Sequence, residues 1–155
     1  MKAIGDTKNH VTINPVGGKQ DSSVFFGASH GATHTINFDQ AALLDSPKNA
    51  GGMASAQLVG HETLEGYDEA KGNTMEDGHD WTASLGFPGF DKATAGSAQV
   101  QNGMVIGFTG TWHVQGTSIN EQIQTRYVTP IPQADFLQGK GLPAAAYPVS
   151  VEKQK

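Results

Sequence analysis

The clearest helical pattern of apolar and polar residues lies between Gly52 and Gly72. Apolar side chains recur there on or near one stripe, at Met53, Ala56, Val59, Leu64 and Tyr67. Because such a stripe buries one side of an α-helix against a core, we predict a helix over about residues 53–71. Gly72 followed by Asn73 is typical of a helix that ends in the left-handed conformation.

Short strand-like patterns precede this helix. Residues 11–13, 24–26 and 33–38 are apolar or alternate between apolar and polar side chains, as β-strands do. Residues 41–44 allow one turn of helix, which Pro47 and its neighbours stop. The N-terminal third therefore predicts a small sheet that packs on the long helix.

The last third of the chain favours β-structure. Strands are predicted at residues 99–100, 104–108 and 111–114, with Gly103, Gly110 and Gly116 between them. Residues 120–127 are compatible with another strand or with a short helix. Antiparallel strands of this kind would complete the core.

Two other stretches are predicted to lack regular structure. Residues 73–90 are polar and are expected to form a loop. Beyond Pro130 the chain is rich in proline and glycine. We expect isolated apolar anchors there at Leu137, Leu142 and Tyr147, and frayed residues at 152–155.

These patterns together predict an α+β fold in one domain. A chain of 155 residues is long enough to bury a core without disulfides or metals. We see no internal repeat or linker that divides residues 1–155, although about residues 1–20 and 148–155 are expected to be extended or disordered. A small N-terminal sheet on one long helix, followed by a glycine-rich β region, is the expected architecture.

Charge and cysteine content restrict the partners. The net charge of −5 with only 10 lysines and arginines argues against nucleic acid or an anionic membrane as the main partner. The absence of cysteine means that a metal site must use histidine and carboxylate ligands. The sequence shows no signal peptide and no membrane-spanning run, so secretion would need a non-classical route or a fusion partner. The compartment and the oligomeric state stay open.

The predicted helix carries a set of metal-binding residue types. His61 and Glu65 are four residues apart, so on a helix they point the same way. Glu62 projects beside them. Zinc hydrolases use two ligands at this spacing, with an adjacent glutamate as general base, in the motif H-E-x-x-H. Here the motif is H-E-x-x-E, and a carboxylate is also a legitimate zinc ligand.

Further site residues are proposed from the surrounding sequence. His79, in the predicted loop after the helix, is the best third ligand. Asp77 or Asp80 could ligate instead or accept a hydrogen bond from an imidazole. His34 is a possible substrate contact or structural residue, and Tyr127 a possible oxyanion stabiliser.

This region resembles the zincin metallopeptidases. The similarity lies in the extended segment of residues 35–38, the helix of residues 58–62 and the stretch of residues 67–72, and it covers about residues 33–80. It is closest to compact domains of secreted bacterial effectors and polymorphic toxins. The resemblance implies that His61 is a zinc ligand and Glu62 the general base, whereas Glu65 stands where the family has histidine.

The expected function is hydrolysis of a peptide bond in a peptide or protein substrate. Zn²⁺ or another divalent metal would be held by His61, Glu65 and His79, and Glu62 would transfer the proton. A glycine-rich, acidic chain without cysteine also suits a non-enzymatic assembly component, such as a tail, spike or decoration subunit. In that alternative the metal site would be structural or incidental, and the zincin-like site would have no activity.

Overall fold

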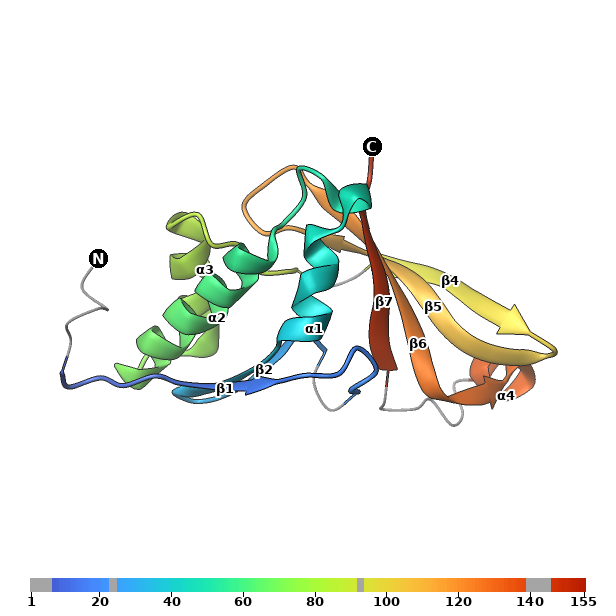
Figure 1. Cartoon of the computed structure of the whole chain (residues 1–155), viewed down its shortest axis with the longest axis horizontal. Coiled ribbons are helices and arrows are strands. Elements are labelled where there is room, and N and C mark those ends of the chain that lie inside the picture. Colours follow the sequence, from blue (N-terminus) through green and yellow to red (C-terminus); the bar gives the residue numbers. More distant parts are fainter. Residues whose placement is uncertain (1–6, 23–24, 92–93, 139–145) are drawn as a thin grey trace.

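In the part of the chain that the structure describes, two separate β-sheets and the helices packed beside them build an α+β fold (Figure 1). The computed structural model describes residues 7–22, 25–91, 94–138 and 146–155. Both the fold class and the N-terminal sheet beside one long helix confirm the prediction from the sequence. No helix in the described ranges is long and apolar enough to cross a membrane.

The first sheet has three short strands in the order β1-β3-β2. They are β1 (Thr12–Val16), β2 (Gly27–His30) and β3 (Thr33–Asn37). β1 pairs in parallel with the central strand β3, and β2 and β3 form an antiparallel hairpin. Gly31 has a φ of +60° in the hairpin turn, a backbone conformation that glycine adopts without steric cost.

The apolar segment at residues 24–26 is not the predicted strand. Val24 lies outside the described residues, and Phe25 and Phe26 form a bend before β2 begins at Gly27. Phe26 has a φ of +62°, and its N–H donates to Gln40 Oε1 at 2.8 Å. The bend turns the Phe26 side chain into the core, where it is 3% exposed. Residue pattern alone does not separate such a core anchor from a strand.

Helical segments follow the first sheet. They are α1 (Phe38–Ala41), two 3-10 turns (Ala42–Asp45 and Pro47–Asn49), α2 (Ser55–Ala70) and α3 (Met75–Ser84). α2 is the predicted central helix, slightly shorter than expected. Phe38 begins α1 and is 45% exposed, so it does not share the buried side of β3 with His34 and Ile36.

α3 corrects the prediction of a loop over residues 73–90 at residues 75–84, whereas residues 73–74 and 85–89 lie outside helices and strands as expected. The Thr74 side chain accepts a hydrogen bond from the Asp77 N–H at 3.2 Å, and Glu76 and Asp77 place negative charge in the first turn. Both features stabilise a helix N-terminus. The residues that suggested a polar loop are thus the N-terminal residues of a helix.

The second sheet is antiparallel, in the order β4-β5-β6-β7. Its strands are β4 (Thr94–Gln101), β5 (Met104–His113), β6 (Asn120–Pro132) and β7 (Ala146–Lys153). Asn102 and Gly103 both have positive φ in the β4–β5 turn, the conformation of a two-residue hairpin. Gly110 lies within β5 and does not separate two strands.

The C-terminal region is more regular than predicted. β6 continues to Pro132, a short helix α4 (Gln133–Leu137) follows, and β7 includes Glu152 and Lys153 of the expected frayed tail. Leu137 is 76% exposed and is not an anchor. Tyr147 lies in β7, and Leu142 is outside the described residues.

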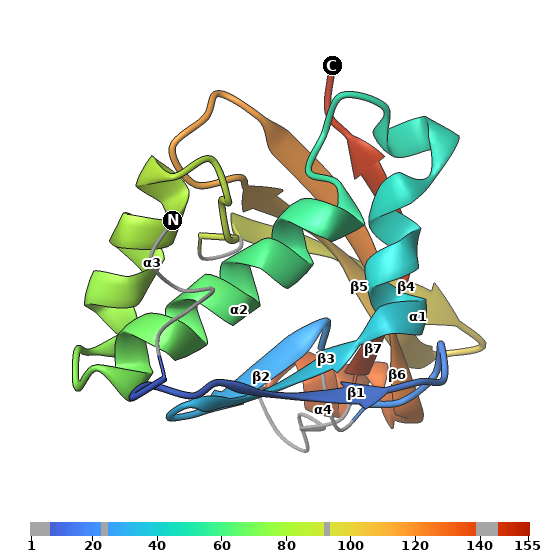
Figure 2. The ribbon, with the colours of Figure 1, turned by 60° about the vertical axis from the view of Figure 1, so that its left-hand side comes forward.

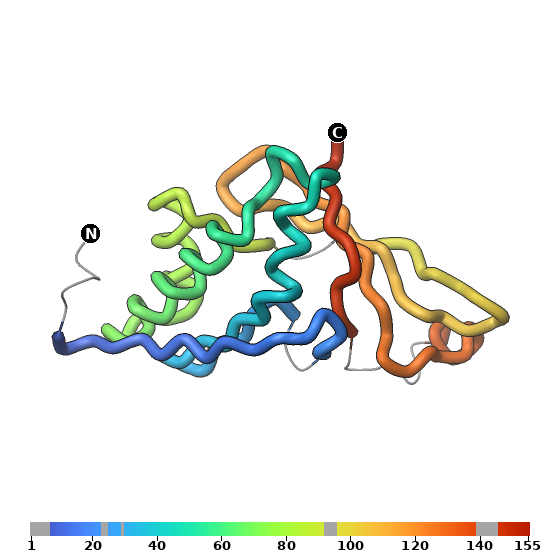
Figure 3. The backbone as a smooth tube through the Cα atoms, viewed as in Figure 1, coloured from blue at the N-terminus to red at the C-terminus, as the bar shows by residue number. Residues whose placement is uncertain are grey.

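The main core lies between the start of α2, the turns before it and the second sheet. Its buried side chains are Phe26, Ala41, Leu44, Met53, Leu58, Val114, Ile123 and Val151. Figure 2 shows α2 crossing the molecule between the small sheet and the four-stranded sheet. β7 runs beside the 3-10 turns (Figure 3), where Ser46 Oγ donates to the Val151 carbonyl at 3.1 Å. These contacts fix the N-terminal end of α2 against the second sheet.

Candidate metal centre

His61 and Glu65 point to the same side of α2, as their spacing predicts. Both are almost fully buried, at 1% and 2% exposure. His61 Nε2 lies 3.8 Å from Glu65 Oε2. Charged groups are rarely buried without a partner, because removal from water disfavours them strongly. A buried His–Glu pair therefore requires a compensating group nearby.

His79 completes this group from α3. Its Nδ1 lies 3.0 Å from His61 Nε2, and its Nε2 lies 3.0 Å from Glu65 Oε1. α3 approaches α2 closely at Gly78, where a Cβ atom would be 3.2 Å from Glu65 Cγ. The predicted third ligand is thus beside the other two, although a helix and not a loop positions it.

The ring of His61 is held in one orientation. Its Nδ1 lies 2.9 Å from the Phe87 carbonyl oxygen and 2.9 Å from Thr82 Oγ1. A carbonyl only accepts, and the Thr82 hydroxyl donates to the His79 carbonyl, so His61 carries its proton on Nδ1. The lone pair is then on Nε2, which faces His79 and Glu65. Metal-binding histidines are commonly oriented in this way by a carbonyl or carboxylate.

Glu62 lies beside the group and pairs with His34 of β3. Glu62 Oε2 is 2.9 Å from His34 Nδ1. A Cβ atom at Gly27 would be only 3.0 Å from Glu62 Cδ, so glycine at the start of β2 leaves room for this carboxylate. His34 thus contacts the proposed general base directly.

Sequence reasoning missed Glu69, on the last turns of the same helix. Its Oε2 lies 3.7 Å from His34 Nε2, and its side chain is 8% exposed. Glu69 is four residues from Glu65 and seven from Glu62, so all three project from one side of α2. This spacing in the sequence could have identified Glu69 as a further member of the group. The fold brings the three carboxyl groups close together in the interior.

Burial and like charges change the acidity of these groups. Burial, with the charges of Glu62 and Glu69, raises the pKa of Glu65 to about 7, although His34 acts in the opposite direction. Burial lowers the pKa of His61, which favours its neutral form. Burial alone would lower the pKa of His34, but its hydrogen bond to Glu62 and the carboxylates around it raise that pKa overall.

Two overlapping groups of side chains could hold a metal ion. His61, Glu65 and His79 form one, and His34, Glu62 and Glu65 form the other; each group offers ligand atoms within 4.8 Å of one another. Glu65 Oε1 is buried and accepts no hydrogen bond from the part of the chain that the structure describes, although His79 Nε2 lies 3.0 Å away. Nitrogen and carboxylate ligands in this combination suit zinc and related divalent ions. The residues present therefore fit a bound metal.

A cavity of about 170 Å³ opens beside the group. His61, Glu62 and His79 line its polar end. Its other walls are Phe25, Phe26, Gly27, Leu58, Gly89, Phe90 and Trp112. A Cβ atom at Gly89 would be 2.8 Å from His61 Nε2, so a larger residue there would crowd the site. The site combines ionisable groups with an apolar space for a ligand.

The other proposed site residues have different surroundings. Asp77 belongs to the N-terminal cap of α3, and Asp80 accepts a hydrogen bond from Gln115 at 3.1 Å. Tyr127 lies on β6 against Phe108. None of the three belongs to either ligand group or to the cavity wall in the described part of the chain.

The pKa of Glu65 predicts how pH affects the metal-free protein. The folded-state pKa of about 7 lies above the ordinary 4.5, so between these values the unfolded state has already lost the proton that the folded state keeps. This contribution to the free energy of unfolding therefore falls as pH rises from 4.5 to 7 and is then constant. In Glu65→Gln it is absent.

We expect the stability of Glu65→Gln relative to wild type to increase by roughly 3 kcal/mol between pH 4.5 and 8. Urea unfolding in the presence of a chelator would measure this difference across the pH range. Parallel pH profiles of the two proteins would contradict a buried, ionisable Glu65.

Comparison with known proteins yields no further assignment. No protein-family model matches this chain, and neither a curated protein nor a solved structure is similar enough to count as a match.

Proposed function

We propose that this protein is a metal-dependent hydrolase that cleaves peptide bonds. The observation that carries the proposal is the convergence of His61, Glu65 and His79 from two helices, with Glu62 beside them at a cavity. The H-E-x-x-E motif, read as a zincin variant, supports the same assignment. Zn²⁺ or a similar divalent ion is the proposed cofactor.

The residues of the centre divide into ligands and a base. His61, Glu65 and His79 would hold the ion, and the Phe87 carbonyl keeps Nε2 of His61 free to bind it. When bound, such an ion supplies Lewis acidity that activates water and polarises a carbonyl group. Glu62 accepts the proton of the attacking water and returns it to the leaving amine. In the metal-free protein His34 Nδ1 lies 2.9 Å from the Glu62 carboxylate.

The cavity supports a peptide with a large apolar side chain as the substrate. Phe25 and Trp112 stack with their centroids 5.9 Å apart, and Phe90 lies beside Phe26. Aromatic walls favour burial of apolar groups. A peptide or protein is therefore the proposed partner, in the setting of a small bacterial effector or toxin domain that the motif resemblance implies.

A peptide library tests this proposal. Protein that has been stripped by a chelator and reloaded with saturating Zn²⁺ should cleave bonds next to large apolar residues, as read by mass spectrometry of the products. The stripped protein is the control and should cleave nothing. Stoichiometric binding of Zn²⁺ without any cleavage would contradict hydrolysis and favour the assembly-subunit alternative with a structural ion.

A further inference from the structure

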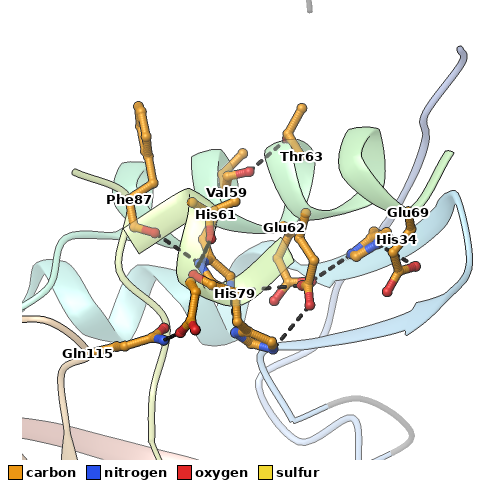
Figure 4. Close-up of polar contacts among 12 residues, drawn as sticks. His34, Val59, His61, Glu62, Thr63, Glu69, His79, Phe87 and Gln115 are labelled. Carbon is orange, nitrogen blue, oxygen red and sulfur yellow. Dashed lines mark hydrogen bonds and ion pairs between the residues drawn. The ribbon is translucent and has the colours of Figure 1, made fainter. Parts of the chain in front are cut away.

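Two buried polar atoms on the side of Glu62 away from His79 have no hydrogen-bond partner among the described residues. They are His34 Nε2 and Glu69 Oε2, which lie 3.7 Å apart. Figure 4 shows Glu62 between the His61–His79 pair and the His34–Glu69 pair. His34 is fully buried. Since nearly all buried polar atoms in proteins are satisfied, such a pair requires an explanation.

The imidazolium form of His34 could donate to both neighbouring carboxylates, but neutral His34, the form that binds a metal, cannot satisfy both. With its proton on Nδ1 it donates to Glu62 Oε2, but the lone pair of Nε2 then faces Glu69 Oε2. With its proton on Nε2 it can donate a hydrogen bond to Glu69, but the lone pair of Nδ1 then faces the Glu62 carboxylate. A cation beside Nδ1 and Glu62 removes this conflict, because both atoms become ligands and Nε2–H is directed at Glu69.

This arrangement is common at metal sites. A ligating histidine usually directs its other N–H to a carboxylate or a carbonyl, which fixes the ring. His61 has the Phe87 carbonyl in that position, and His34 has Glu69. Gly66 allows His34 to lie directly on α2, since a Cβ atom there would be 2.7 Å from His34 Cδ2. His61 and His34 therefore each have one ring nitrogen available to bind a metal and a second ring nitrogen that faces an oxygen atom.

Glu65 belongs to both groups of possible ligands. A carboxylate has two oxygens and can bridge two ions, which in two-metal hydrolases lie about 3.5–4 Å apart. Glu62, Glu65 and Glu69 also bring three carboxyl groups to one side of α2, and metal binding requires Glu65 to be ionised. One divalent cation leaves an excess negative charge among them in the interior, and a second compensates it.

We propose that this centre binds two divalent cations bridged by Glu65, the second of which is held by His34, Glu65 and one oxygen of Glu62, with Glu69 orienting His34; the other Glu62 oxygen stays free to accept the proton. The inference deepens the proposed function and rests on it for its catalytic meaning. The number of ions, however, is measurable without any substrate.

The experiment counts ions in the chelator-stripped whole chain with Mn²⁺ as the probe. Equilibrium dialysis should give two Mn²⁺ per wild-type chain, and the electron paramagnetic resonance spectrum should show an exchange-coupled pair. His34→Gln, which keeps polarity and similar size, should bind one Mn²⁺ with the spectrum of an isolated ion. His113→Gln is the matched control, because His113 contacts Asp91 at 2.8 Å outside the centre, and it should keep both ions.

Glu69→Gln provides a second variant if His34→Gln does not fold. Loss of an outer partner typically lowers metal affinity about 10–100-fold, and here only the second ion should be affected. One Mn²⁺ per wild-type chain at saturation would overturn the proposal and indicate a protonated His34 between two carboxylates. Two uncoupled ions would also overturn it, since Glu65 would not bridge them. Zinc-dependent cleavage with a single bound ion would overturn this inference while the proposed hydrolysis stands.

Discussion

Replacement of Glu62 by glutamine is expected to lower the rate of peptide hydrolysis by about 10²–10⁴-fold, the usual contribution of a general base. Glutamine keeps the size of the side chain and can still accept a hydrogen bond from His34 Nδ1, which lies 2.9 Å from Glu62. It cannot accept a proton at neutral pH. Steady-state kinetics on a substrate from the peptide library would measure the effect, which should appear in kcat.

Two controls separate this effect from damage to the fold. The variant should retain the ion held by His61, Glu65 and His79, as elemental analysis would show. Glu152→Gln changes a glutamate that pairs with Lys48 on the surface, and it should keep wild-type activity. Full activity in Glu62→Gln would exclude Glu62 as the base, whatever the metal content.

The second large effect is expected for His61→Ala. A ligand that binds only the folded state at a thousand times its Kd stabilises that state by about 4 kcal/mol. In a chain of this size the gain corresponds to a rise in Tm of roughly 10 °C. Wild type should show such a rise when Zn²⁺ is added to stripped protein, and His61→Ala should lose most of it together with the bound metal.

The metal-induced change in Tm is the relevant quantity here. His61 is buried and contacts Phe87 and Thr82, so its removal also lowers the Tm of the metal-free protein. Subtracting the Tm of each stripped protein removes this effect. His113→Ala should give the wild-type gain. An equal zinc-induced gain in His61→Ala and wild type would remove His61 from the ligand set.

Local pattern explains which parts of the fold were predictable. β3 was predicted from the alternation of its residues, and α2 from an apolar stripe over several helical turns. Both patterns are long enough that one atypical residue does not obscure them. α3 was missed because its first turn is made of Thr74, Glu76 and Asp77, which are as common in loops as at helix N-termini. The bend at Phe26 was mistaken for a strand because the contact that produces it, with Gln40 of α1, is distant in sequence.

Local sequence was enough to predict that His61 and Glu65 face the same side of a helix, with Glu62 beside them. Helix geometry links residues three and four apart, so these relations hold wherever the helix packs. The α+β class followed from the same local periodicities. No comparable rule predicts which residues that are distant in sequence come into contact.

The residues that surround His61 and Glu65 depend on tertiary packing and could not be predicted from the local sequence. His79 approaches because Gly78 lets α3 pack on Glu65, and His34 approaches because Gly66 lets β3 pack on α2. The aromatic cavity joins Phe25, Phe90 and Trp112 from three separate segments. These contacts depend on long-range packing, which leaves no periodic pattern in the sequence, and they turn a helical motif into a buried site that could hold metal.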